Sequence, residues 1–300
     1  MEMNKTVPVI SVLMPAFNVE KYIAMAVDSV LNQTFSDFEL IIINDGSTDD
    51  TGEIVEKYKN TDSRIRVYHM ENRGLANARN LAVSYAGGEY VTFVDSDDAV
   101  KEDYLECLYE NAVKYDADVA VSSYYRYVEA ENVYYNVVLE QGYEVKAFTG
   151  LEAYQNYYSP VNGYNIAFAV AWGKLFRREL LNRLHFPSGK LHEDAFTIYK
   201  AYLLSDKIIY VNKNLYMYRQ RASSIMSSQW SRERMRDFIE QHEERLSLLS
   251  VMGIEITEDN KADYIAGLRK CIRIALINGY IDEYELFKQK LNLIEERKKR

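Results

Sequence analysis

Short apolar runs alternate with segments of helical apolar spacing from residue 9 to residue 121. Continuous apolar strands with intervening helices indicate a mostly parallel sheet that is covered on both faces. The pattern therefore predicts an α/β protein. The expected strands are residues 9–14, 40–43, 65–69, 90–94 and 119–121, and the expected helices are residues 22–31, 51–58, 75–85 and 104–115.

From about Met217 onward the apolar residues recur only at helical spacing, in the stretches 235–249, 265–276 and 286–294. This part carries no strand signal and no catalytic cluster. We expect a helical extension that packs on the core or forms an interface between copies of the chain. Residues 257–260 are expected to form a loop between two of its helices.

The formal net charge of -9 argues against a nucleic-acid binder, because affinity for polyanions comes mainly from clustered Lys and Arg. An acidic protein that binds phosphates needs a local device, such as a metal ion or a few well-placed arginines. The only cysteines, Cys107 and Cys271, lack metal-ligand spacing, which favours buried free thiols in a reducing compartment.

The amino-terminal residues lack the layout of a signal peptide, and no run approaches the roughly 20 apolar residues of a membrane helix. A cytoplasmic location is therefore expected. The basic tail at residues 297–300 is interpreted as a solvated helix end, and peripheral contact with a membrane is the other interpretation.

An acidic cluster follows the fourth expected strand, in Phe93-Val94-Asp95-Ser96-Asp97-Asp98. Three carboxylates within four residues repel one another unless a cation or their exposure relieves the repulsion. Mg²⁺ and Mn²⁺ are commonly held by one or two carboxylates together with substrate phosphates, so the cluster suits a metal that bridges a diphosphate. An acidic turn before the helix at Tyr104 explains the cluster equally well.

The second expected strand ends in Asn44-Asp45-Gly46-Ser47-Thr48-Asp49. Gly46 permits a sharp turn, and Ser47 or Thr48 can cap the next helix. Capping does not require Asp45, whose carboxylate stands where the strand ends and could accept the N–H of a uracil ring. The capping role alone remains the alternative.

Two further segments suit a nucleotide without being diagnostic. Pro15 is expected to end the first strand, and Phe17 offers an aromatic face to a base. Residues 72–80 open a helix, and helix N-termini favour anions. There Arg79 would point its guanidinium group towards a phosphate.

A third acidic segment is His192-Glu193-Asp194, which precedes a helical pattern. A zinc protease motif would need a second histidine at position 196, where the chain has Phe196, so zinc hydrolysis is disfavoured. The two carboxylates could be plain partners of the helix dipole. Alternatively, one of them could accept a proton from an incoming hydroxyl group.

Taken in order, these segments resemble those of the family 2 glycosyltransferases, bacterial inverting enzymes with a GT-A fold. The match covers roughly residues 9–226 and includes Trp172-Gly173-Lys174-Leu175-Phe176. The resemblance implies a GT-A domain over residues 1–226, which is a Rossmann-like, mostly parallel sheet with helices on both faces. Residues 227–300 would form the helical extension, for packing or for homo-oligomer formation.

The resemblance also implies an activity. A hexose or N-acetylhexosamine would move from a UDP-sugar to a hydroxyl group of a glycan, lipid-linked or protein-linked acceptor, with Mn²⁺ or Mg²⁺ as cofactor. Asp194 would be the base, and Asp97 the direct metal ligand. Asp98, Trp172 and Glu193 would lie near the donor sugar or the acceptor. The residues that would contact the nucleotide are Pro15, Ala16, Phe17, Glu20, Asp45, Asn72, Arg79, Asp95, Ser96, Arg219 and Arg221, of which Asp95 would also face the metal.

The segment 218–226 resembles the mobile loop with which the family closes over the phosphates. Competing functions fit less well. A sugar-phosphate nucleotidyltransferase would need a glycine-rich, basic loop for a triphosphate, and residues 15–20 do not provide one. A degenerate transferase that acts as a scaffold would be expected to lack Asp97 or Asp194, and both are present. Kinase and dinucleotide-binding motifs are absent from the sequence.

Overall fold

The computed structural model describes residues 7–138, 144–157, 163–221 and 230–298. The chain divides into two compact units. The first, called the sheet unit, comprises Met1–Gly189 and Thr197–Ala222, and the second, called the helical unit, comprises Lys190–Phe196 and Ser223–Arg300. The predicted domain boundary at residue 226 lies outside the described residues.

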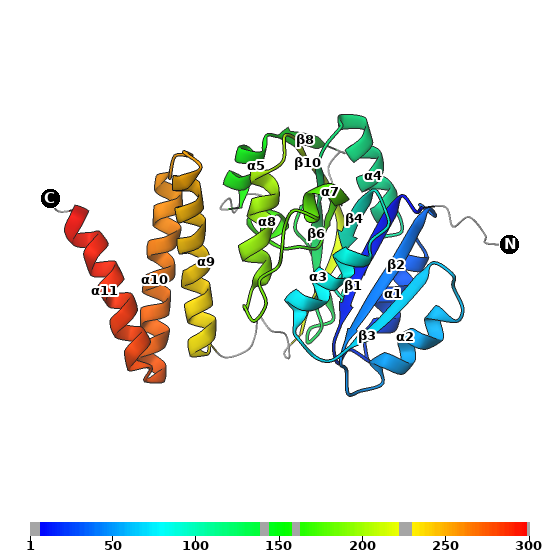
Figure 1. Ribbon diagram of the computed structural model, residues 1–300, viewed down its shortest axis with the longest axis horizontal. Helices are drawn as coiled ribbons and strands as arrows, with labels where there is room; N and C mark the ends of the chain where they lie inside the picture. Colours follow the sequence, from blue (N-terminus) through cyan, green and yellow to red (C-terminus); the bar gives the residue numbers. More distant parts are fainter. Residues whose placement is uncertain (1–6, 139–143, 158–162, 222–229, 299–300) are drawn as a thin grey trace. The chain divides into compact units, whose positions relative to one another are not determined.

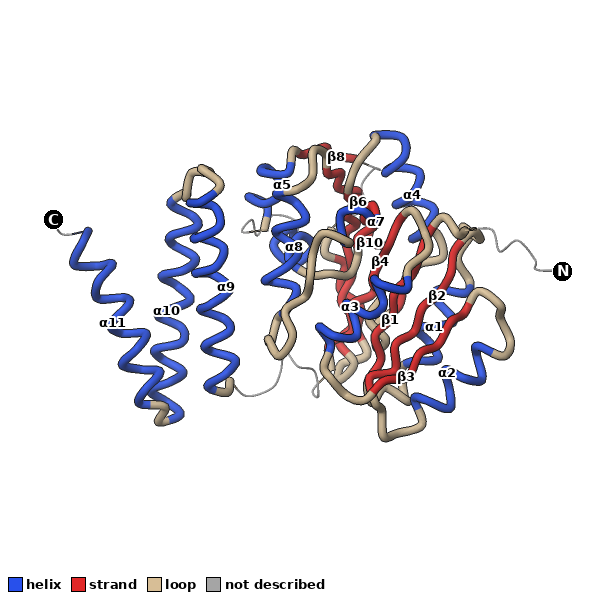
Figure 2. Tube along the Cα trace, in the orientation of Figure 1, coloured by secondary structure: helices blue, strands red, loops and turns tan. Residues whose placement is uncertain are grey.

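The alternating strands and helices predicted for the first part of the chain are confirmed (Figures 1 and 2). Strand β1 pairs in parallel with β2 on one side and with β4 on the other, and β2 pairs in parallel with β3. The elements are β1 (Ile10–Ala16), α1 (Ile23–Leu31), β2 (Phe38–Asp45), α2 (Thr51–Lys59), β3 (Ile65–Met70), α3 (Leu75–Tyr85), β4 (Tyr90–Phe93) and α4 (Tyr104–Tyr115).

The rest of the sheet is mixed. Strand β9 lies antiparallel between β4 and β6, β10 runs parallel to β6, and the other strands are short antiparallel additions. The order along the main path is β3-β2-β1-β4-β9-β6-β10-β5. The elements are β5 (Ala99–Val100), β6 (Val119–Val128), β7 (Val133–Asn136), β8 (Val145–Phe148), α5 (Gly150–Asn156), α6 (Tyr164–Ala169), β9 (Lys174–Arg177), α7 (Arg178–Leu181), α8 (Glu193–Leu203) and β10 (Ile208–Gln220).

The strand order places a topological switch point between β1 and β4. The chain moves outward from β1 through β2 to β3 and then returns to the other side of β1 at β4. Because such crossovers are right-handed, α1 and α2 cover one face of the sheet and α3 covers the other (Figures 1 and 2). Ligands of open α/β sheets bind outside the carboxyl ends of the strands at such a point.

Two expectations for the sheet are wrong. Pro15 does not end β1, because the strand continues to Ala16 with Pro15 in register with Ile43 of β2. The proline is tolerated there because the ladder between β1 and β4 reaches only Leu13. The region after Met217 also begins with strand rather than helix, since β10 runs to Gln220.

The helical unit contains three long helices that lie side by side (Figure 1), α9 (Arg232–Val251), α10 (Glu258–Asn278) and α11 (Ile281–Lys298). The expected loop at residues 257–260 is wrong. Thr257 and Asn260 form a reciprocal capping box, so Glu258–Asn260 is the first turn of α10. The core of the unit consists of Met235, Ile239, Leu268, Cys271, Ala275 and Phe287.

None of the helices in the described part of the chain is long and apolar enough to cross a membrane. Self-association through α9–α11 and membrane contact of the basic tail stay predictions. Two residues of that tail, Lys299 and Arg300, lie outside the described residues.

Candidate active site

Two loops at the carboxyl ends of β1 and β2 are joined by hydrogen bonds. The Asn18 side-chain oxygen accepts the Thr48 N–H at 2.8 Å, and the Asn18 N–H donates to the Ser47 hydroxyl oxygen at 3.0 Å. The Thr51 hydroxyl oxygen accepts the Val19 N–H at 2.8 Å. In each of these bonds a side chain of one loop accepts a backbone N–H of the other loop, so both loops are held in one arrangement.

The residues predicted to line the nucleoside pocket lie along this pair of loops. Pro15 and Ala16 are buried in β1, whereas 46% of Phe17 is exposed. Glu20 is also exposed, and its carboxylate accepts the Asp50 N–H at 3.1 Å. The ring of Phe17 is therefore accessible to a base. Glu20 instead connects its own loop to the loop that precedes α2.

Asp45 is buried at the end of β2 and fastens the turn that precedes α3. Its two carboxylate oxygens accept the Arg73 and Gly74 N–H groups, each at 2.8 Å. Gly46, at φ +70°, allows the backbone of Asn72 to pack closely against it, since a Cβ atom at position 46 would lie 2.6 Å from the Asn72 nitrogen. Asn72 itself is exposed beside Asp45. Recognition of uracil by Asp45 stays a prediction.

The acidic turn after β4 is anchored by its last carboxylate. Asp98 accepts the Tyr216 hydroxyl at 2.8 Å and the Arg219 N–H at 2.8 Å, and the Asp95 N–H donates to the Tyr216 oxygen at 3.0 Å. Burial, together with the charges of Asp97 and Asp95, raises the pKa of Asp98 well above its usual range. Ser96 is buried as well. The buried Asp98 carboxylate therefore anchors the turn to β10. A contact between Asp98 and the donor sugar stays a prediction.

Three arginines surround this turn. The Arg79 guanidinium is 3.1 Å from Asp95 and is almost fully buried. It lies over the rings of Phe93 and Phe186, which shield it from solvent. Its predicted contact with the nucleotide stays a prediction.

The other two arginines come from the end of β10. The Arg221 guanidinium forms an ion pair with Asp97 at 2.8 Å, and the Arg219 Nε–H donates to the Asp97 carbonyl oxygen at 2.8 Å. Of the predicted phosphate loop, 218–221 is described, and residues 222–226 lie outside the described residues.

The turn offers two carboxylates, Asp95 and Asp97, that could serve as ligands of a divalent cation. Burial and the neighbouring charge of Asp95 raise the pKa of Asp97, and the opposing effect of Arg221 does not cancel them. A cation with hard oxygen preference would relieve this repulsion. The described residues hold no group of three His, Cys, Asp or Glu side chains suited to a metal. Two carboxylates fit Mg²⁺ or Mn²⁺ whose remaining ligands are phosphates and water.

Trp172 lies beneath the site rather than at its surface. Only 4% of it is exposed, and its ring stacks on Tyr216 at 4.3 Å and on Tyr218 at 5.4 Å. Trp172 thus supports the tyrosine that holds Asp98, and its contact with a sugar stays a prediction. No motif marks Tyr216 among the 26 tyrosines of the chain, so no sequence signal could have selected it.

The remaining predicted residues, Glu193 and Asp194, open helix α8 within the helical unit. Glu193 is buried, whereas Asp194 is partly exposed and accepts the Ala195 N–H at 2.8 Å. The structure therefore brings the predicted nucleotide, metal and Trp172 positions together in the sheet unit, and the predicted base belongs to the other unit.

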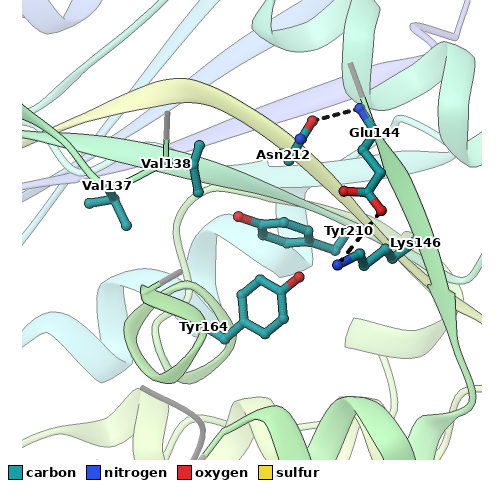
Figure 3. A pocket seen from close by; sticks show the side chains of 7 residues that line it. All are labelled: Val137, Val138, Glu144, Lys146, Tyr164, Tyr210 and Asn212. Carbon is teal, nitrogen blue, oxygen red and sulfur yellow. Dashed lines mark hydrogen bonds and ion pairs between the residues drawn. The ribbon is translucent and has the colours of Figure 1, made fainter. Parts of the chain in front are cut away.

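A cavity of about 360 Å³ lies among other residues of the sheet unit (Figure 3). Its lining contains two tyrosines, an amide and an ion pair, and none of the predicted site residues. It is lined by Val137, Val138, Glu144, Lys146, Tyr164, Tyr210 and Asn212.

Comparisons with known proteins identify the family of the chain. The model of glycosyl transferase family 2 matches residues 11–184. The chain is 39% identical over 270 residues to glycosyltransferase GlyA of Streptococcus pneumoniae, covering 90% of this chain but 38% of GlyA. It is 38% identical over 249 residues to glycosyltransferase GlyG of the same organism, covering 83% of each chain.

Among solved structures, S. aureus TarS 1–349 in complex with UDP-GlcNAc superposes with a TM-score of 0.66 at 23% identity, covering 95% of this chain and 92% of that one. This likeness confirms the predicted GT-A fold. The chain belongs to the family 2 glycosyltransferases.

Proposed function

We propose that the protein is a metal-dependent, inverting glycosyltransferase. It would move a hexose or N-acetylhexosamine from a UDP-sugar to a hydroxyl group of a glycan, glycolipid or glycoprotein. The observation that carries this proposal is the turn Asp95–Asp98 beside the switch point of the sheet, in which the partly buried carboxylates of Asp95 and Asp97 pair with arginines. TarS, which shares the fold, was crystallised with UDP-GlcNAc, and this supports a UDP-linked donor.

The donor would bind across the carboxyl ends of β1, β2 and β4. Phe17 offers its face to the base, and the exposed Asn72 lies beside the turn that Asp45 holds. Arg221, at the edge of the acidic turn, would exchange its contact with Asp97 for one with the diphosphate. Guanidinium groups pair well with phosphate oxygens because their donors form a planar fork.

Asp97 and Asp95 would hold Mn²⁺ or Mg²⁺, which supplies positive charge to the diphosphate as the sugar leaves. Tyr216 and Arg219 keep this turn in place through Asp98. The arginines add preorganised donors where negative charge develops, and such donors lower the barrier because they need no reorganisation.

Asp194 would accept the proton of the acceptor hydroxyl while that oxygen attacks the anomeric carbon from the face opposite the diphosphate. The bond to the diphosphate breaks in the same displacement, so the anomeric configuration inverts. No covalent intermediate with the protein is required.

The first test is a calorimetric titration of UDP into the purified protein, with Mn²⁺ and then with EDTA. We expect binding that depends on the metal. UDP-sugars are then screened for UDP release with and without saccharide acceptors, and NMR of the product reports the anomeric configuration. Asp97→Asn should lose metal-dependent turnover, and Asp194→Asn should lose transfer while UDP still binds.

Three results would each contradict part of the proposal. Absence of UDP binding in both conditions would remove the donor site from the acidic turn. Undiminished activity of Asp97→Asn in chelator would exclude the proposed metal dependence. Undiminished activity of Asp194→Asn would exclude Asp194 as the base.

A further inference from the structure

Helix α9 contacts the segment that leads into the proposed base. Asp237 of α9 is buried, and its Oδ1 atom accepts a hydrogen bond from the Lys190 ammonium group at 2.9 Å. Its Oδ2 atom accepts the Leu191 N–H at 2.9 Å. A single buried carboxylate thus holds both the side chain of one residue and the backbone of the next, a charge-assisted pair of contacts.

A second residue of α9, Arg234, contacts His192, which follows Leu191 in the chain. The Nε–H of Arg234, which is 3% exposed, donates to Nε2 of His192 at 3.3 Å. Arg234 is itself held over the Trp230 ring at 4.7 Å. Burial is the main reason why the pKa of His192 lies below its ordinary value, so the ring is neutral at pH 7 and can accept this hydrogen bond.

His192 needs such support because its backbone is in the left-handed region, at φ 61°. A residue other than glycine adopts this backbone conformation only where surrounding contacts enforce it. The His192 carbonyl oxygen accepts the Ala195 N–H at 3.0 Å and so begins helix α8. The direction of the first turn of α8, which carries Glu193 and Asp194, therefore follows from the conformation of His192.

We propose that Asp237 and Arg234 are positioning residues of the transferase reaction: by holding Lys190, Leu191 and His192, they aim the Asp194 carboxylate at the acceptor hydroxyl. Both lie beyond residues 11–184, the part that the family model matches. Helix α9 would then contribute to catalysis and not only to the stability of the fold. This inference rests on the proposed function, in which Asp194 is the base.

The same contacts would exist if α9 merely stabilised the fold, and kinetics separates the two roles. A positioning defect lowers kcat and leaves the KM of the UDP-sugar unchanged, since the donor site is built from other residues. A purely structural defect lowers the melting temperature and the amount of active enzyme without that selectivity.

Asp237→Ala removes both contacts, Asp237→Asn keeps an oxygen for the Leu191 N–H, and Glu240→Gln is the matched control. Glu240 lies on the same helix and pairs with the same Lys190 at 2.7 Å, but its side chain is 53% exposed. Turnover is followed as UDP release from the UDP-sugar that wild type uses. We expect kcat to fall about tenfold to a hundredfold in Asp237→Ala, less in Asp237→Asn, and within twofold in Glu240→Gln, because small misplacements are costly to catalysis and exposed ion pairs contribute little.

Amide hydrogen exchange tests the clamp without activity. In wild type the Leu191 amide should be protected, and Asp237→Ala should abolish that protection while amides inside α10 stay protected. If Asp237→Ala does not fold, Asp237→Asn serves for the kinetic measurement, and a kcat equal to that of wild type in this variant would then count against the positioning role. A wild type that turns over no UDP-sugar refutes the proposed function, while protection of Leu191 would still show that the clamp exists.

Three results would overturn the positioning role. The first is an unprotected Leu191 amide in wild type. The second is an unchanged kcat in Asp237→Ala together with lost protection. The third is a fall in kcat that Glu240→Gln reproduces.

Discussion

The hydroxyl group of Tyr216 joins two parts of the acidic turn, because it donates to Asp98 at 2.8 Å and accepts the Asp95 N–H at 3.0 Å. Its ring is fixed by the parallel stack on Trp172, at an interplanar angle of 10°. The spacing of the carboxylates thus depends on a strand more than a hundred residues further along the chain.

Tyr216→Phe should weaken metal-dependent UDP binding and destabilise the protein. The change leaves a buried carboxyl oxygen and a backbone N–H without their partner, at about 1–3 kcal/mol for each unsatisfied group. Thermal unfolding and the UDP titration measure the two effects. Tyr210→Phe on the same strand is the control, since Tyr210 lines the cavity of Figure 3 rather than the acidic turn. This variant should leave metal-dependent UDP binding unchanged, and equal losses of UDP affinity in both variants would refute the role of Tyr216.

Gly46→Ala should disrupt the turn that Asp45 holds. A Cβ atom at this position would lie 2.6 Å from the Asn72 nitrogen, and the left-handed backbone adds about 1–2 kcal/mol for a residue other than glycine. Gly253→Ala, at the same φ of 70° but with nothing within 4 Å, should incur only the backbone cost. We expect Gly46→Ala to lose more stability and to lose UDP affinity as well. Similar unfolding curves for the two variants would show that the turn can adapt.

Arg221→Ala should separate metal binding from nucleotide binding. The guanidinium pairs with Asp97 at 2.8 Å, so its removal frees a carboxylate for a cation but takes a donor from the diphosphate. Titration of Mn²⁺ alone should therefore show equal or tighter binding, and titration of UDP with Mn²⁺ should show weaker binding. Arg126→Ala, an exposed arginine of β6, is the control. Weaker Mn²⁺ binding in Arg221→Ala would contradict this reasoning.

Cys271 should react with thiol reagents only when the helical unit opens. Burial raises the pKa of its thiol to about 12, and the reactive thiolate is therefore scarce at pH 8. In a Cys107→Ser variant, labelling by a disulfide reagent should be slow in buffer and complete in guanidinium chloride. Rapid labelling of the native variant would mean that α10 opens without global unfolding.

The sequence predicts the first four strands and helices well because each is a local pattern. The strand at residues 65–69 and the helix at 75–85, for example, match β3 and α3 to within one residue. The antiparallel strand β9 and the short strands β5, β7 and β8 carry weak patterns, and their pairing joins distant segments. The error at residues 257–260 has a different origin, since polar residues serve a helix cap as readily as a loop.

The segments of the candidate site could be selected from the sequence, but the contacts within it could not. Asp95, Asp97 and Arg79 belong to recognisable segments, yet the burial of Arg79 depends on Phe186, which is more than a hundred residues away. Tyr216 and Asp237 lie on an ordinary strand and an ordinary helix, and only the folded chain brings them to Asp98 and Leu191.

Three hydrogen bonds join the loop of Asn18 and Val19 to the loop of Ser47, Thr48 and Thr51, and they have a consequence for how a nucleotide would bind. Two loops that are already tied to each other lose little freedom when a base settles on them, so the protein spends little binding free energy on ordering. Loss of one of the exposed hydrogen bonds of Asn18 to Ser47 or Thr48 should therefore lower the affinity for the nucleoside by more than an exposed hydrogen bond would ordinarily contribute. In this sense the two loops that we propose to receive the donor nucleoside are held together by folding, before any substrate arrives.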